Sequence, residues 1–134
     1  VLHIVHAHPK ALSLLESRDI MHGGIVHSFS GDLETARRYL SFDLIPSISA
    51  AVLSRGTGKA FETLRRTVLS LGPNEFVLET DSPDQPPVSE KGQPNRPVNL
   101  ISVARWVAAI RGEAFEAVLE RSAETVKKIF KLKV

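Results

Sequence analysis

Residues 76–83 read Phe-Val-Leu-Glu-Thr-Asp-Ser-Pro, a short apolar run that ends in two carboxylates and a proline. A run of this length, bounded by turn-forming residues, is typical of a buried β-strand, which we expect over residues 76–80. Three similar runs precede it, at residues 2–6, 24–29 and 44–49. Their nearly continuous apolar character is typical of parallel strands, which are covered on both faces. The four segments therefore predict a parallel sheet.

Helical patterns separate these predicted strands. The amphipathic stretches are residues 9–16, 32–40 and 60–71. Pro9 suits the first turn of the first helix, and Ser30 or Asp32 would cap the second. Strands that alternate with helices predict an α/β fold with right-handed crossovers.

A long loop follows the fourth predicted strand. Residues 82–97 hold five prolines, and loops of this length in compact domains are usually functional or disordered. Apolar residues at helical spacing then predict two more helices, over residues 100–110 and 115–130. The lysines near the C-terminus fit the solvated face of the last helix.

The composition excludes several classes of protein. The 134 residues include no cysteine, which removes disulfide scaffolds and cysteine nucleophiles and fits a reducing compartment such as the cytoplasm. No apolar run approaches the roughly 18 residues of a membrane helix. With 43% hydrophobic and 24% charged residues, the chain is expected to form one globular domain. A net charge of +2 permits a polyanionic partner without requiring one.

Polar residues stand where three of the predicted strands end. His6 ends the first apolar run, His27 lies near the end of the second, and Asp81 follows the fourth. The carboxyl ends of parallel strands meet at one edge, so we expect these side chains to converge. Imidazole and carboxylate ligands suit a divalent ion. The alternative is three structural residues, namely buried histidines and a turn aspartate.

Further polar residues near these ends are candidates for substrate contact. His8 would face a substrate if the first strand ends before it. Glu79 lies in an apolar run, where an unpaired carboxylate is costly, so it needs a donor, a cation or a metal nearby. Ser28 and Ser30 belong to a turn that could bind phosphate through backbone N–H groups or simply cap a helix. His22 is expected to lie in a loop without a role.

Three motifs resemble the second half of the TatD-related metal-dependent DNases. They are His27-Ser28-Phe29-Ser30-Gly31, Leu78-Glu79-Thr80-Asp81-Ser82-Pro83 and Gly92-Gln93-Pro94-Asn95-Arg96-Pro97, and Ile4-Val5-His6 is similar to the strand before them. The resemblance implies a TIM-barrel, (β/α)8 hydrolase that cleaves phosphodiester bonds of DNA. It also implies one or two divalent ions, Mg²⁺, Mn²⁺ or Zn²⁺, at the C-terminal rim of the barrel.

The resemblance also implies roles for individual residues. His6, His27 and Asp81 are similar to the metal ligands of strands five, six and eight of the family. Asp81 would also be catalytic, because it would orient or deprotonate the attacking water. Glu79, Asn95 and the turn at residues 28–31 would shape the substrate-binding rim.

The sequence departs from the family pattern in three respects. His8 stands where the family usually has arginine, and Thr125 stands where it usually has asparagine. The family's N-terminal His-x-His strand and Gly-Glu strand, which supply further ligands, do not occur in this sequence. A (β/α)8 barrel needs about 250 residues. We therefore expect residues 1–134 to be one incomplete domain that supplies roughly strands 5–8.

Two alternatives to a DNase remain open. The chain could be a non-enzymatic truncated half-barrel or interaction module, or an amidohydrolase that acts on small substrates. For the DNase interpretation we expect DNA as the substrate and no membrane association. Open strand edges invite pairing, so we also expect a complementary N-terminal half or a second copy as partner.

Overall fold

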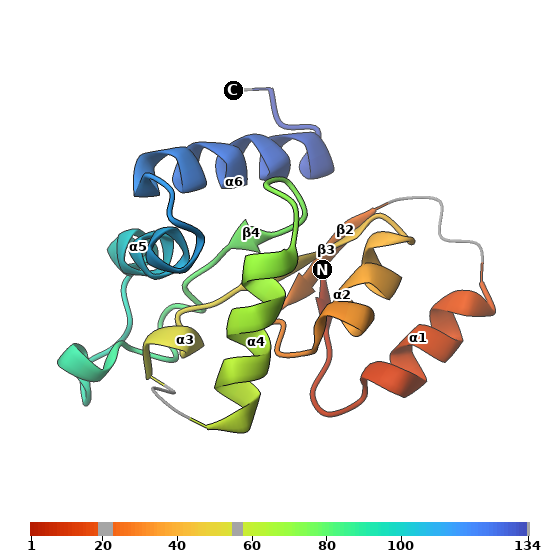
Figure 1. Ribbon diagram of the computed structural model, residues 1–134, viewed down its shortest axis with the longest axis horizontal. Helices are drawn as coiled ribbons and strands as arrows, with labels where there is room; N and C mark the ends of the chain where they lie inside the picture. The colour runs from red at the N-terminus through yellow and green to blue at the C-terminus, as the bar shows by residue number, and fades with distance from the viewer. Residues whose placement is uncertain (19–22, 55–57, 134) are drawn as a thin grey trace.

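Four parallel strands form the centre of the structure, a computed structural model that describes residues 1–18, 23–54 and 58–133 (Figure 1). They are β1 (Leu2–His3), β2 (Gly24–His27), β3 (Leu44–Ile48) and β4 (Val77–Leu78). The strands lie in the order β1-β2-β3-β4, and each neighbouring pair is parallel. The predicted parallel sheet is thus confirmed, while His22 lies outside the described residues.

The first and fourth strands are shorter than predicted, because β1 ends at His3 and not at His6, and β4 covers only Val77–Leu78 of the expected residues 76–80. β1 is an edge strand of the described sheet, and β2 is its neighbour. The pairing stops at the pair of His3 and His27, where β2 itself ends. Ser28 then takes a left-handed backbone conformation with φ 48°, which carries the chain away from the ladder. His6 consequently lies outside the sheet.

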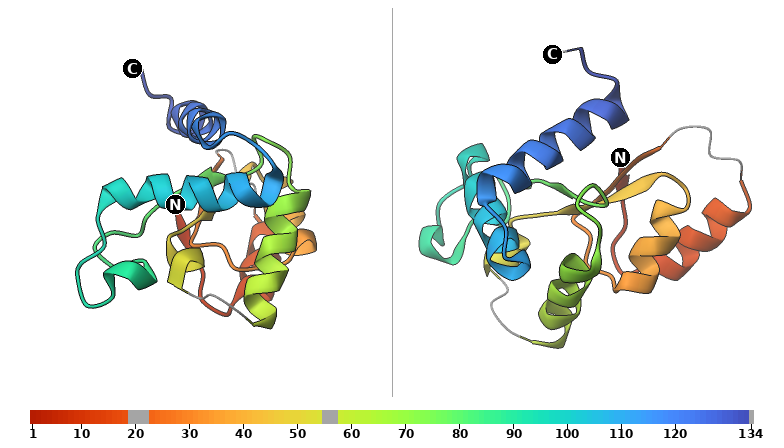
Figure 2. Two further views of the ribbon diagram at one scale, coloured as in Figure 1. Left: turned by 60° about the vertical axis from the view of Figure 1, so that its left-hand side comes forward. Right: turned by 45° about the horizontal axis from the view of Figure 1, so that its top comes forward.

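Most of the helices follow the strands in order around the sheet, and the last helix lies apart from them, at the top of Figure 1 (Figures 1 and 2). The long helices are α1 (His8–Glu16), α2 (Leu33–Leu40), α4 (Lys59–Ser70), α5 (Leu100–Arg111) and α6 (Phe115–Phe130). Each packs against the next one along the chain. This is the arrangement expected of consecutive strand–helix units with crossovers of one hand.

Local signals set the ends of these helices much as predicted. Pro9 lies in the first turn of α1, and the Asp32 side chain caps α2 by accepting a hydrogen bond from the Thr35 N–H at 2.9 Å. Gly112 ends α5 with φ 67°, a conformation that glycine adopts at little cost. The short helix α3 (Ala51–Ser54) was not predicted. Its four residues begin two residues after the predicted strand at 44–49 and are too few to show a helical repeat.

The 3₁₀ turns η1 (Val88–Glu90) and η2 (Pro97–Asn99) give the proline-rich loop its shape. Where the structure describes the chain, no helix is long and apolar enough to cross a membrane. Near the end of α6, Lys127 pairs with Glu124 at 2.9 Å on the exposed surface.

The hydrophobic core lies between the sheet and the helices. Val26 and Ile48 project into it from β2 and β3, are fully buried, and pack with Leu64, Val68 and Val103 of the helices. Side chains alternate between the two faces of a strand. The neighbours His27, Ser47 and Glu79 therefore point to the other face, and this alternation places the polar residues together.

Candidate functional site

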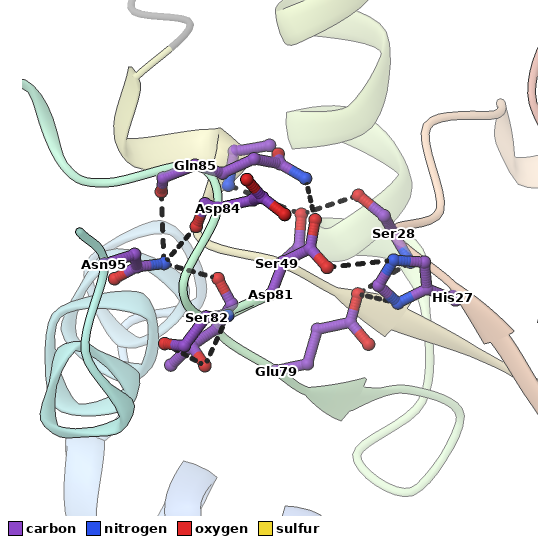
Figure 3. Close-up of polar contacts among 11 residues, drawn as sticks. His27, Ser28, Ser49, Glu79, Asp81, Ser82, Asp84, Gln85 and Asn95 are labelled. Atoms are coloured by element: carbon purple, nitrogen blue, oxygen red, sulfur yellow. Dashed lines mark hydrogen bonds and ion pairs between the residues drawn. The ribbon is translucent and has the colours of Figure 1, made fainter.

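His27, at the end of β2, is held between two carboxylates (Figure 3). Its Nδ1 lies 2.9 Å from Oε1 of Glu79, and its Nε2 lies 3.2 Å from Oδ1 of Asp81. The three side chains are 19%, 21% and 24% exposed, so the group is largely shielded but open on one side. The convergence predicted for His27 and Asp81 is therefore present in the structure.

Glu79 supports His27 from behind and does not line the adjoining cavity. Besides the imidazole, its Oε1 accepts a hydrogen bond from the backbone N–H of Ser28 at 2.7 Å. These donors answer the expectation that a carboxylate here needs a partner. A carboxylate that accepts from one ring nitrogen fixes the tautomer and leaves the other nitrogen as a ligand atom. Glu79 thereby presents Nε2 of His27 toward Asp81.

Asp81 lies three residues beyond β4, in a left-handed conformation with φ 61°. Its Oδ1 faces His27, and its Oδ2 accepts a hydrogen bond from Nε2 of Gln85. Two ligand atoms bound to one divalent ion at about 2.1 Å each lie roughly 3.0–3.4 Å apart. The 3.2 Å separation of Nε2 and Oδ1 falls within this range, so these two residues fit a shared metal ion.

His6 does not join this pair, which corrects the prediction of a three-residue cluster. Across residues 1–18, 23–54 and 58–133, no three side chains of His, Cys, Asp or Glu are grouped to hold a metal ion. The reason is the early end of β1, after which His6 lies exposed with φ 51°. His6 does line a cavity of about 550 Å³ that it shares with His27.

His8 lines the same cavity, as expected of a residue that faces a substrate. It is the first residue of α1, and its Nδ1 lies 2.9 Å from the hydroxyl of the buried Tyr39. Its ring also packs against Phe29 and Tyr39. Burial lowers the pKa of His8, although the nearby Asp32 carboxylate acts in the opposite direction. The ring is thus held in one orientation and favours its neutral form.

Two backbone N–H groups of the turn at residues 28–31 are already bound to Glu79 and to β3, which limits the predicted phosphate cradle. The N–H of Ser28 donates to Glu79, and the N–H of Phe29 donates to the carbonyl of Ser47 at 2.9 Å. The Ser28 hydroxyl lies 2.8 Å from that of Ser49. Ser28 and Ser30 nevertheless both line the cavity. Their predicted contact with a substrate therefore rests on side chains and not on a row of free amides.

Asn95 is a loop anchor, and the expectation that it shapes the substrate rim needs correction. It is only 3% exposed, and its Nδ2 donates to the carbonyls of Thr80, Asp84 and Gln85. Its Oδ1 accepts from the N–H of Arg96 and from Asn99. With both polar atoms used inside the protein, Asn95 ties the two ends of the proline-rich loop together.

Two residues of the site, His3 and Gln85, were not assigned from the sequence. The His3 ring stacks on the His27 ring with centroids 5.1 Å apart, and both His3 and Gln85 line the cavity. The register of two neighbouring strands would have pointed to His3, because it lies opposite His27. Gln85 belongs to an irregular loop, where no periodicity indicates the direction of a side chain.

A protein-family model described as TatD related DNase matches residues 1–131. The chain belongs to this family. The three motifs that carried the resemblance to the TatD-related DNases all lie within the matched residues.

Relatives and solved structures agree with this assignment. An uncharacterized metal-dependent hydrolase of Haemophilus influenzae is 27% identical over 96% of this chain and 48% of its own length. The uncharacterized metal-dependent hydrolase YcfH of Escherichia coli K12 is 28% identical over 97% of this chain and 48% of its own. The crystal structure of the TatD homologue YjjV from Escherichia coli K12 superposes with a TM-score of 0.85 at 26% identity, covering 98% of this chain and 49% of that one. The chain thus spans about half the length of these relatives.

The donor set of the site fits the metal dependence in the relatives' names. Imidazole nitrogen and carboxylate oxygen are ligands of zinc, manganese and other divalent first-row metals. His27 and Asp81 supply one of each, at a separation suited to a single ion. Glu79 provides the outer hydrogen bond that metal-binding histidines usually make.

Proposed function

We propose that this chain supplies part of the active site of a metal-dependent hydrolase that cleaves phosphodiester bonds of DNA. The observation that carries the proposal is the pair formed by His27 Nε2 and Asp81 Oδ1, held 3.2 Å apart beside a cavity lined by further histidines and serines. Membership of the TatD-related DNase family supports the choice of reaction.

Some residues of the site would bind the metal ion, and others would hold these ligands in place. His27 and Asp81 would hold one or two divalent ions, Mg²⁺, Mn²⁺ or Zn²⁺, and His6 lies on the wall of the adjoining cavity. When bound, such an ion lowers the pKa of a coordinated water and stabilises negative charge on a phosphoryl oxygen. Asp81 is the catalytic residue of the proposal, because its carboxylate can orient a water and accept its proton. Glu79 keeps the His27 ring in the orientation that presents Nε2.

The cavity wall offers groups for a phosphodiester. His8, Ser28 and Ser30 line it, and imidazole and hydroxyl groups can donate hydrogen bonds to phosphate oxygens. A cavity of about 550 Å³ lies within the usual range for small-molecule sites, so it could admit a nucleotide unit at a time. DNA is accordingly the partner that we assign to this surface.

The remainder of the active site would come from outside this chain. We assign the four strands to positions 5–8 of a (β/α)8 barrel, whose other strands a complementary N-terminal half or a second copy would supply. In such a barrel the carboxyl ends of all strands contribute to one site. The cytoplasm is the compartment that we expect for the assembled enzyme.

The test is hydrolysis of a fluorescent single-stranded and double-stranded oligonucleotide by the natural protein that contains this chain. We expect cleavage with Mn²⁺, Mg²⁺ or Zn²⁺, loss of cleavage in excess chelator, and a fall of at least about 10³-fold in Asp81→Asn, equivalent to several kcal/mol of barrier. Asp43→Asn is the matched control, because Asp43 is exposed at the opposite end of the sheet, before β3.

Three outcomes would contradict the proposal. Cleavage that survives verified metal removal would exclude the metal-dependent mechanism. Hydrolysis of small amides without cleavage of any oligonucleotide would favour an amidohydrolase. A natural protein that binds no metal and hydrolyses neither substrate would indicate the non-enzymatic module.

A further inference from the structure

The loop that follows β4 contains a polar side chain aimed at Asp81. Gln85, four residues further on, donates a hydrogen bond from Nε2 to Oδ2 of Asp81 (Figure 3). The other oxygen of the same carboxylate, Oδ1, faces Nε2 of His27 at 3.2 Å. The two oxygens of Asp81 thus have separate partners on opposite sides, one on the loop and one on the sheet.

We propose that Gln85 is a positioning residue that occupies Oδ2 of Asp81 and so reserves Oδ1 for a metal ion shared with His27. The inference rests on the proposed function, because it concerns the same ion. A free carboxylate can turn about its Cβ–Cγ bond and can bind a metal through one oxygen or both. A hydrogen bond to one oxygen restricts this choice, as outer hydrogen bonds to metal-binding carboxylates generally do.

The backbone around Gln85 is held firmly enough for such a role. Gln85 has φ 55°, and its carbonyl accepts a hydrogen bond from Nδ2 of Asn95 at 3.2 Å. The same Nδ2 binds the carbonyls of Thr80 at 2.6 Å and Asp84 at 2.8 Å. The N–H of Asp84 in turn donates to the carbonyl of Asp81 at 2.8 Å. Residues 80–85 are therefore closed into a small loop around one buried amide.

Gln85 also forms part of the cavity wall, together with His6, His8 and Ser30. Its amide has two N–H groups and one carbonyl oxygen, and the hydrogen bond to Asp81 uses a single N–H. The residue therefore lies between the proposed ligand and the space open to a substrate. This placement explains how a residue of an irregular loop can influence the ligand without being a ligand itself.

The first measurement needs no metal. In the metal-free natural protein that contains this chain, we expect an Nε2 proton of Gln85 to exchange with solvent more slowly than the side-chain amide protons of the exposed Gln93, as followed by ¹H–¹⁵N NMR. Replacing the acceptor by Asp81→Ala should remove this protection. Equal exchange of Gln85 and Gln93 in the unsubstituted chain would overturn the inference.

The second measurement is Mn²⁺ binding by calorimetry to the natural protein that contains this chain. Gln85→Met keeps the length of the side chain but cannot donate, so we expect a 10- to 100-fold weaker Kd, the usual effect of losing an outer hydrogen bond. Gln93→Met, on the same loop, should bind as the unsubstituted protein does. Thermal unfolding of Gln85→Met at an unchanged midpoint would separate positioning from a loss of fold.

The outcomes separate this inference from the proposed function. If Asp81→Asn abolishes Mn²⁺ binding while Gln85→Met leaves it unchanged, the metal site stands and the role of Gln85 is refuted. If neither Asp81→Asn nor His27→Ala changes Mn²⁺ binding, the proposed function fails and this inference fails with it. Weaker binding in Gln85→Met at an unchanged unfolding midpoint supports both.

Discussion

The two sides of the candidate site are built very differently. On the side of β2 and β4, His27 lies between Glu79 and Asp81, and Asp81 is held in turn by Gln85. On the side of β1, His6 is exposed, follows the end of its strand by three residues, and makes no hydrogen bond to any residue that the structure describes. The side chains of His27 and Asp81 are held by contacts within this chain, whereas His6 only lines the same cavity as His27.

The contrast follows from what the residues beyond each strand contact. β2 and β3 are central, and the register of β3 with β4 places Glu79 beside the end of β3, from where its carboxylate reaches His27 at 2.9 Å. β1 and β4 are both edge strands of the described sheet, but the residues after β4 contact His27 and Gln85, whereas the pairing of β1 ends at His3 and His6 lies beyond it. A side chain gains a fixed direction when neighbours on both sides can bind it. The four predictions below test how far this difference extends, in order of decreasing effect.

Asn95→Ala should have the largest effect, because it removes a buried amide that binds three carbonyls. We expect the free energy of unfolding to fall by about 3 kcal/mol, since each lost hydrogen bond contributes roughly 1 kcal/mol. Urea unfolding of the 134-residue chain measures this, with the exposed Asn74→Ala as the control. A loss below about 1 kcal/mol would mean that the loop does not depend on this anchor.

Glu79→Gln should weaken metal binding rather than the fold. The amide oxygen of a glutamine in this position lacks the negative charge, so it accepts from His27 and Ser28 more weakly than the carboxylate oxygen does. We expect a 10- to 100-fold higher Kd for Mn²⁺, measured by calorimetry on the natural protein. Glu75→Gln serves as control, because Glu75 binds the backbone of Gly72 before β4 begins. An unchanged Kd would show that metal binding does not depend on the contact between Glu79 and Nδ1 of His27.

Asp32→Ala tests a hydrogen bond that serves one helix only. At pH 7 we expect a loss of about 1 kcal/mol in the free energy of unfolding, as is typical for an N-cap, and little change in Asp32→Asn. The Thr35 N–H lowers the pKa of Asp32 from its ordinary value of 3.8, so the unfolded chain protonates first as the pH falls. The stabilisation is therefore present above pH 3.8 and lost as the pH falls through the lowered value. Urea unfolding at several pH values measures the difference in the free energy of unfolding between the unsubstituted chain and Asp32→Ala. A difference that does not change with pH would refute the prediction.

His6→Ala should have the smallest effect on the isolated chain. The side chain is exposed, and exposed substitutions away from caps and networks usually change stability by less than about 0.5 kcal/mol. The unfolding midpoint of the 134-residue chain in urea is the measurement. A larger loss would show that His6 is already engaged within the chain, and the difference between the two sides of the site would disappear.

The order of the elements and the proximity of His27 and Asp81 could be predicted from the sequence. Continuous apolar runs with helical patterns between them predicted the parallel sheet, and strand ends predicted that His27 and Asp81 would meet. Both inferences use periodicity and chain order, which are local properties. The short helix α3 could not be predicted in this way, because four residues are too few to show a helical repeat.

What the sequence did not reveal depends on side-chain direction in irregular backbone. Asn95 and Gln85 lie in the same proline-rich loop, yet the former points inward to three carbonyls and the latter points to Asp81. No repeat distinguishes them. His6 was misplaced for a related reason, because the end of β1 is determined by its partner strand and not by its own apolar residues.

The left-handed backbone at the strand ends has a consequence for adaptation. His6, Ser28, Asp81 and Gln85 all have φ between 48° and 61°, which costs a residue with a side chain on the order of 1 kcal/mol. Glycine at Ser28 would relieve this cost, but it would also remove the hydroxyl that meets Ser49 and let the turn beside His27 relax. Selection for heat tolerance and selection for a fixed site therefore favour different residues at this position.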